Sequence, residues 1–589
     1  MKNFENNKID YLLLFGLFLL VLFLEGWWLN LSPGYFNPDP NRFMNQTRDF
    51  THFLFSEFNL KSALFVGGEY PPLLHFAGSI FRLIFGSSFI VLGLAATSFS
   101  LILIFSLYGI GRYLGGRISG WAGALLGVSS PLWFFECRGY NPDVPLAAMT
   151  ALSLYLLLAS DKFKDRKMTL FFFVAFSLGT LSKPSFLFFT IFPLFYLAYQ
   201  VISKESGSAW LRVVPWLVFA IFIGVGVWLL KKPSVYLPLR ANYYYYLVFL
   251  FTLGLFLFII LRAVERKKDI SKKDSLFNMT YGGIIFILLA GIWYPPMIPD
   301  LARKTVFQMG STIQFLPYLK IAGDVFKGGI ILLPVGIISA LISKRREVYT
   351  LLLLSFLPGW LLVSRASAGV VIPRYALGIL PSAVILAIGW LPLIKPKFQK
   401  GIFILVLLIV TWQFLSGFWQ FQPGHIPAWK PTFSSADRDP FAAEKKLVRI
   451  IYQDLPEKDK TPVINVLPLP LSLVTVRLTR FPLDLQVTRY LALDKGYFKL
   501  RWLGPDKPGF LKIEQVCYFD YFIVASVDGD HGVFETQENW LEKCLGLKPL
   551  LIEEFSLPGA DSVIRLYRNP VRVDLPAGEH LPMEYPLDL

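Results

Sequence analysis

The chain has 589 residues, of which 54% are hydrophobic and 17% charged, and its mean hydropathy is +0.52. This composition excludes an ordinary soluble protein of this length and favours a chain that lies largely in a membrane. The net charge of +16 does not indicate a nucleic-acid-binding protein, because the basic residues form short clusters between apolar stretches rather than one basic face.

Apolar stretches long enough to cross a bilayer recur from Tyr11 to Phe418. The predicted fold class is therefore a mainly α-helical membrane protein, a polytopic bundle of about thirteen transmembrane helices. The apolar stretch 71–85 is shorter and contains His75 and Arg82, so we expect an interfacial or re-entrant helix there. The expected spans are residues 11–29, 88–110, 118–135, 142–159, 168–182, 184–202, 210–230, 243–261, 279–298, 328–343, 348–364, 375–393 and 401–418.

Basic residues predict the orientation of these spans. With the N-terminus in the cytoplasm, the inner connections hold 21 Lys and Arg in 53 residues, whereas the outer ones hold 14 in 111 residues. Cytoplasmic loops are enriched in Lys and Arg, so this orientation is favoured over its inverse. An odd number of spans then places the C-terminal part outside the cytoplasm.

The composition changes after the last span, where the chain becomes polar, charged and rich in proline. We expect a membrane domain over residues 1–427, with a long outer loop at 31–87, and an extracytoplasmic α/β domain over residues 428–589. Its position suggests acceptor recognition or covering of a membrane site. Cys517 and Cys544 both fall in this domain, and the sequence leaves open whether they form a disulfide or stay free. The expected strands are 462–466, 521–525, 550–555 and 562–567, with helices at 442–452 and 538–545.

Several ionisable residues fall at the outer ends of the expected spans. Charged groups at a membrane edge are costly unless they are solvated or paired, so their convergence from different helices indicates a polar cavity. The alternative for each residue is a side chain that reaches the headgroups or water by itself. The residues concerned are Asp39, Asp49, Arg138, Asp143, Lys183, Arg365 and Arg374.

Four ordered stretches resemble the C-type membrane glycosyltransferases, in particular the protein O-mannosyltransferase and lipid A aminoarabinose transferase group. They are Asn37-Pro38-Asp39-Pro40 with Glu69-Tyr70-Pro71-Pro72-Leu73, then Arg138-Gly139-Tyr140-Asn141-Pro142-Asp143, Ser182-Lys183-Pro184, and Pro373-Arg374-Tyr375. Many members carry two adjacent acids in the first loop, whereas Asp39 is followed by Pro40, so Asp49 is kept as a second candidate for the first acid.

The resemblance implies an inverting transfer of a sugar from a polyprenyl-phosphate donor to a lipid, protein or glycan acceptor. Such a reaction needs a carboxylate that takes a proton and cations that neutralise the leaving phosphate. We expect Asp39 to act as the base and Lys183 and Arg374 to bind the phosphate. Substrate contacts are expected from Tyr70, Arg138 and Tyr375.

Asp143 has several possible roles. It could orient the acceptor, form a salt bridge with Arg138, join Asp39 in holding a divalent cation, or only stabilise the N-terminus of its helix. Asp39 has a structural alternative as a turn residue in the Asn-Pro-Asp-Pro segment. No cofactor is required by these residues, and a divalent cation remains open.

Other chemistries have little support in the sequence. The five histidines show no zinc-ligand spacing, and no Gly-Lys-Ser/Thr or dinucleotide fingerprint follows a strand. Two other functions remain as alternatives: a transporter or flippase of lipid-linked glycans, and an oligosaccharide ligase or polymerase. A transporter would favour charges near the bilayer midplane, whereas these charges cluster at one edge.

Overall fold

In the computed structural model, the described residues are 8–206 without 32–37, 69 and 87, then 274–294, 332–366 without 344, and 373–418. In the C-terminal part they are mainly 463–466, 501–503, 521–526, 545–556 and 563–570. The chain divides into two compact units, Met1–Trp27 with Thr47–His425, and Trp28–Gln46 with Ile426–Leu589. The expected spans 210–230 and 243–261 lie outside the described residues.

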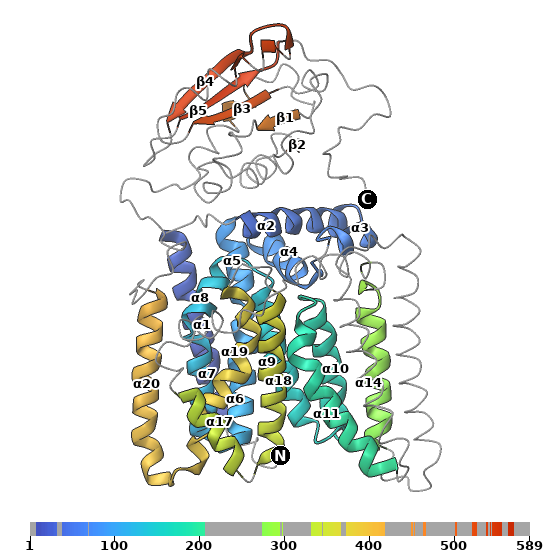
Figure 1. Cartoon of the computed structure of the whole chain (residues 1–589), viewed down its shortest axis with the longest axis vertical. Helices are drawn as coiled ribbons and strands as arrows, with labels where there is room; N and C mark the ends of the chain where they lie inside the picture. The colour runs from blue at the N-terminus through green and yellow to red at the C-terminus, as the bar shows by residue number, and fades with distance from the viewer. Residues whose placement is uncertain are drawn as a thin grey trace. The chain divides into compact units, whose positions relative to one another are not determined.

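The described part of residues 1–427 is helical (Figure 1). Its first elements are α1 (Lys8–Leu31), α2 (Pro38–Thr51), the π-helix η1 (His52–Ser56), α3 (Leu60–Phe65), α4 (Leu73–Phe85), α5 (Phe89–Thr97), α6 (Ser100–Gly115), α7 (Arg117–Val128) and α8 (Pro131–Arg138). The chain continues with α9 (Asp143–Ala159), α10 (Arg166–Thr180), α11 (Phe186–Ser206), α14 (Asp274–Ala290), α17 (Leu332–Ile342), α18 (Arg346–Ala366), η4 (Pro373–Ile379), α19 (Leu380–Ile388), η5 (Leu391–Leu393) and α20 (Pro396–Phe418).

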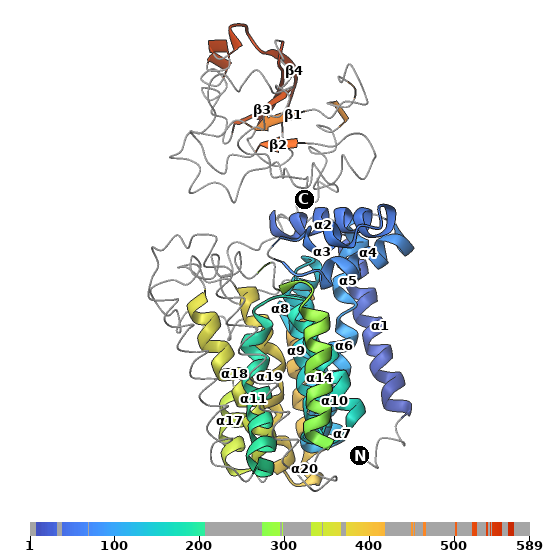
Figure 2. The same cartoon turned by 90° about the vertical axis from the view of Figure 1, so that its right-hand side faces the viewer.

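Among the described residues, four helical segments are long and apolar enough to cross a membrane: Lys8–Asn30, Ile90–Gly115, Arg374–Leu393 and Lys397–Phe414. The pair α7 and α8, bent by 49°, adds a fifth if it is counted as one span. A mainly helical membrane protein is therefore confirmed, and the number of thirteen spans stays a prediction. Helix α4 has 13 residues, too few to cross a bilayer, and lies at the top of the bundle in both views (Figures 1 and 2).

Helix α9 is at the centre of the packing. It contacts α6, α10, α11, α19 and η4, which come from widely separated parts of the chain. Small buried residues such as Ala147, Ala148 and Ala151 line it. Small side chains let helix backbones approach closely, which is how membrane helices gain packing energy without a hydrophobic effect. Helix α9 is consequently packed closely against its neighbours.

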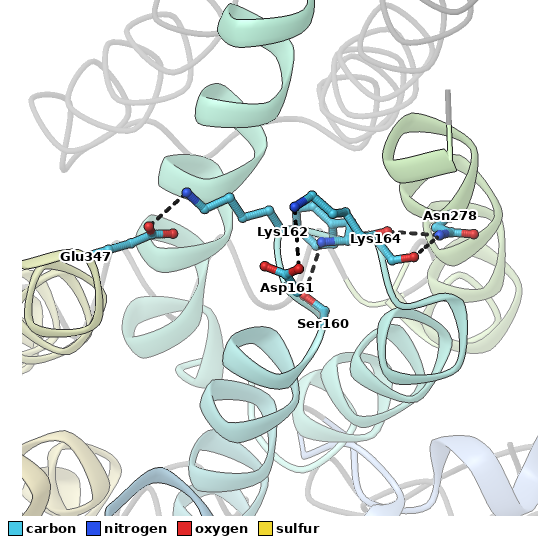
Figure 3. A network of polar contacts seen from close by, with 7 residues as sticks. Ser160, Asp161, Lys162, Lys164, Asn278 and Glu347 are labelled. Carbon is cyan, nitrogen blue, oxygen red and sulfur yellow. Dashed lines mark hydrogen bonds and ion pairs between the residues drawn. The ribbon is translucent and has the colours of Figure 1, made fainter. Parts of the chain in front are cut away.

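The turn after α9 ties three helices together (Figure 3). Asp161, Lys162 and Phe163 all have positive φ, at 45°, 59° and 65°, a conformation that non-glycine residues seldom adopt. Asn278 of α14 compensates by donating to the carbonyl oxygens of Phe163 at 2.9 Å and of Lys164 at 3.2 Å. Lys162 forms an ion pair of 2.8 Å with Glu347 at the start of α18, which links the turn to a third helix.

The C-terminal unit contains a mixed five-stranded sheet in the order β2-β1-β3-β5-β4. Its strands are β1 (Val463–Val466), β2 (Arg501–Leu503), β3 (Tyr521–Ser526), β4 (Leu550–Ser556) and β5 (Val563–Arg568). β1 is parallel to β2 and β3, whereas β5 is antiparallel to β3 and β4. The four expected strands are confirmed, and β2 was not predicted. Cys517, Cys544 and most of the expected helix 442–452 lie outside the described residues.

Candidate functional site

Asp143 is the first residue of α9 and is only 2% exposed. Pro142 precedes it at the helix cap position, so the helix begins immediately after the Asn-Pro pair. A carboxylate in the first turn interacts favourably with the positive end of the helix dipole. That local effect accounts for an acid at this position, but two cations from other segments also reach it.

Lys183 reaches Asp143 from the turn between α10 and α11. Its Nζ donates to Asp143 Oδ1 at 2.7 Å, and the two side chains are 13% and 4% exposed. Arg374 of η4 approaches the other carboxylate oxygen, with its Nε 3.9 Å from Asp143 Oδ2. This second distance is too long for a hydrogen bond, so the attraction of Arg374 is Coulombic.

Tyr375 completes this group. The Lys183 Nζ lies 4.6 Å from the centre of the Tyr375 ring, and the Arg374 Cζ lies 5.8 Å from it. Cations at these distances are attracted by the negative face of an aromatic ring. We call Asp143, Lys183, Arg374 and Tyr375 the cation cluster. Four expected site residues from three chain segments therefore lie together, with both cations close to the carboxylate of Asp143.

The Pro71-Pro72-Leu73 motif has a structural role beside the cation cluster. Neither proline has a backbone N–H, and the first available one, that of Leu73, donates to the Leu181 carbonyl oxygen at 3.0 Å, two residues before Lys183. The start of α4 is thereby joined to the Lys183 turn. Tyr70, expected to contact substrate, is half-buried just before this junction.

A second junction joins α4 to the loop before Asp143. The Tyr140 hydroxyl donates to the Leu74 carbonyl oxygen at 2.9 Å and lies 2.8 Å from Thr47 Oγ1, which is 2.9 Å from His75 Nδ1. Gly78 leaves room for it, because a Cβ there would stand 1.9 Å from the Tyr140 hydroxyl oxygen. Tyr140 has a φ of 47°, so tertiary contacts hold the loop in an uncommon conformation beside Asp143.

Arg138, expected to contact substrate and considered as a partner for Asp143, forms its ion pair with Glu25 of α1. Its Nε and Nη2 donate to the Glu25 carboxylate at 2.9 and 3.2 Å, and both side chains are almost fully buried. Such a two-pronged pair fixes α8 against α1. The sequence reasoning missed Glu25, although an acid inside an apolar span signals a buried partner.

Glu136 was also missed. It is completely buried on α8, and its Oε2 accepts a 2.5 Å hydrogen bond from Asn141 Nδ2. Its charge interacts with those of Asp143, Arg374 and Lys183. The available signal was its place five residues before Asn141 and seven before Asp143, which is visible only once the chain reversal between α8 and α9 is known.

Of the two candidates for the first acid, the structure describes the side chain of Asp49 but not that of Asp39. Asp39 lies in the first turn of α2, and its side chain is outside the described residues. Asp49 lies near the end of the same helix, where it pairs with the neighbouring Arg48. Within the described residues, no group of three or more His, Cys, Asp or Glu side chains could hold a metal ion.

Known proteins are similar to part of this chain in sequence and to nearly all of it in fold. Residues 69–230 match the family model of dolichyl-phosphate-mannose-protein mannosyltransferases. The crystal structure of ArnT from Cupriavidus metallidurans in the apo state aligns over 96% of this chain and 99% of that one, with a TM-score of 0.51 and 13% identity. The structure of the same protein bound to undecaprenyl phosphate aligns over the same shares, with a TM-score of 0.50 and 13% identity. No curated protein matches the sequence.

The fold is that of a multi-pass membrane protein like ArnT, and residues 69–230 are similar to membrane mannosyltransferases. Within that class the chain resembles the protein mannosyltransferases over residues 69–230 and shares the fold of ArnT along nearly its whole length. The resemblance read from the ordered motifs is therefore confirmed.

Proposed function

We propose that the chain transfers a sugar from a polyprenyl-phosphate donor to an acceptor nucleophile, with inversion at the anomeric carbon, on the outer face of the membrane. The observation that carries this proposal is the cation cluster, in which Lys183 and Arg374 both lie close to the carboxylate of Asp143. The fold likeness to a protein solved with undecaprenyl phosphate supports the same class of donor.

The cluster suits a phosphate for electrostatic reasons. Lys183 supplies a compact ammonium charge and Arg374 a planar fork of donors, and both are largely buried, where charge–charge interactions are weakly screened. Asp143 holds the two cations in place through its two carboxylate oxygens. A bound phosphate takes over part of that role, so the cations are already oriented when charge develops on the leaving group.

In the proposed reaction, the acceptor oxygen attacks the anomeric carbon while the bond from that carbon to the phosphate oxygen breaks. The acceptor proton goes to the carboxylate of Asp39, and the bonding electrons leave with the polyprenyl phosphate. A single displacement of this kind inverts the anomeric configuration, since no enzyme nucleophile attacks the sugar. Asp39 is chosen because it lies in the first-loop motif, with Asp49 as the second candidate.

The remaining parts of the chain receive roles from their positions. Tyr375 is proposed to line the phosphate site, where its ring already contacts both cations. Tyr70 is proposed to contact substrate beside the start of α4. Residues 428–589 are proposed to form an outer domain that recognises the acceptor, which would be a lipid, a protein or a glycan.

The test is turnover by the purified full chain in lipid nanodiscs. A panel of undecaprenyl-phosphate sugars is incubated with a mixture of candidate acceptors, and released undecaprenyl phosphate is measured. We expect release with one donor class, a loss of at least about 100-fold in Asp39→Asn and in Arg374→Ala, and wild-type rates in Lys164→Ala, an exposed lysine after α9. Unchanged turnover in both site variants would remove the proposed assignment.

A further inference from the structure

Glu136 is a buried carboxylate that the proposed reaction does not use. Its residue exposure is 0%, its Oε2 accepts one hydrogen bond from Asn141, and its Oε1 has no hydrogen-bond partner among the described residues. An ionised carboxylate in such surroundings is costly unless nearby positive charge compensates it. A Glu136 anion therefore depends on positive charge beyond hydrogen-bond distance, and without that charge the carboxyl is neutral.

The charges that act on Glu136 belong to the cation cluster. Its hydrogen-bond partner Asn141 is two residues before Asp143, and α8 packs against η4, which carries Arg374. Arg374 and Lys183 attract a Glu136 anion and Asp143 repels it, so the four groups carry two positive and two negative charges when all are ionised. The other packed helices add little. Helix α5 has no charged residue, and α7 and α20 carry theirs in or near the first turn, at the ends far from α8: Arg117, Lys397 and Lys400. On α8 itself, Arg138 is paired with Glu25.

A phosphate at Lys183 and Arg374 changes this balance. It brings at least one negative charge to the cations that support the Glu136 anion, and the interior screens the repulsion weakly. Two outcomes are open to the site: the phosphate binds less tightly, or Glu136 gives up its charge. The second removes the repulsion and leaves a neutral acid that can still accept the hydrogen bond from Asn141.

We propose that Glu136 takes up a proton when a lipid-linked phosphate docks at Lys183 and Arg374, so that phosphate binding and release are coupled to proton uptake and release. This inference rests on the proposed function. Glu136 is a positioning residue in this scheme, because it acts through the cations rather than on the reacting atoms. The proton stays on the Glu136 carboxyl while the phosphate is bound and returns to solvent when it leaves.

The experiment measures binding to the full chain in nanodiscs between pH 6 and 9. The probe is the methyl diester of undecaprenyl phosphate, which keeps one negative charge throughout this range, so only protein groups change ionisation. We expect the wild-type affinity to fall by up to about tenfold per pH unit once Glu136 must take up its proton from solvent. Neutral undecaprenol should show no such slope.

Three variants distinguish proton uptake by Glu136 from a purely structural role of this residue. Glu136→Gln should bind the diester at pH 9 at least as tightly as at pH 6, because it mimics the protonated acid and its amide can still bond Asn141. Glu136→Asp keeps a titratable group and should keep a slope. Glu347→Gln, a carboxylate beyond the other end of α9, should keep the wild-type profile.

A slope in Glu136→Gln equal to that of the wild type, or no slope in the wild type, would overturn the role of Glu136 and leave the proposed function intact. Failure of the wild type to bind the diester and undecaprenyl phosphate at every pH would overturn both.

Discussion

Glu25 and Arg138 show what a buried charge in this bundle requires. Each is almost fully enclosed, and each satisfies the other through two hydrogen bonds. Removing one partner leaves the other as an uncompensated buried charge, which costs about 3–5 kcal/mol. We therefore expect Glu25→Gln to lower the thermal stability of the purified protein strongly, as measured by unfolding in detergent.

The double variant Glu25→Leu with Arg138→Met is the control for that prediction. Replacing a buried pair with apolar residues of similar size is often close to neutral, so most of the stability should return. A double variant as unstable as Glu25→Gln would contradict a role in which the two residues serve each other, and would point to a separate function of Arg138.

The sequence pointed to the residues of the cation cluster but not to every acidic residue around it. Asp143, Lys183 and Arg374 lie beside prolines at expected helix ends, Tyr375 follows Arg374, and the ordered motifs marked all four. Glu25 and Glu136 carry no local motif, because their importance comes from burial and from partners more than 100 positions away, or across a chain reversal. Such partners become visible only in three dimensions.

The contact between α4 and the loop before α9 can be tested by a substitution at Tyr140. Tyr140→Phe removes the hydroxyl that binds the Leu74 carbonyl oxygen and contacts Thr47, which should cost about 1–2 kcal/mol. Because the loop carries Asp143, donor turnover should also fall. The matched control is Tyr281→Phe at an exposed position on α14, expected to change neither stability nor turnover.

Helices were predicted better than their interruptions. The expected spans 11–29, 142–159 and 168–182 match α1, α9 and α10 closely, because long apolar runs leave the backbone no alternative to a helix in lipid. The break between α5 and α6 and the 49° bend before Pro131 were not predicted. The bend has a local cause, because Pro131 begins α8 and has no backbone N–H to continue the hydrogen bonds of α7. The three-residue β2 has too short a pattern to be recognised.

The orientation of the whole molecule follows from charge and gives a further prediction. The turn Asp161–Lys164 should face the cytoplasm, and the region 428–589 should lie outside it. A single cysteine at position 164, in a chain whose native cysteines are replaced by serine, should react with an impermeant maleimide only after the cells are opened. A second test fuses a reporter that functions only in the cytoplasm after Leu589. Activity of this reporter would contradict the orientation.

The central claim is that the cation cluster binds the phosphate of a polyprenyl lipid. The most direct measurement is the affinity of undecaprenyl phosphate for the wild type, Lys183→Ala, Arg374→Ala and Lys164→Ala in nanodiscs. Each site variant loses a charge-assisted contact, so we expect its affinity to fall by roughly ten- to a hundredfold, while Lys164→Ala binds like the wild type. Equal affinity in all four proteins would contradict the claim.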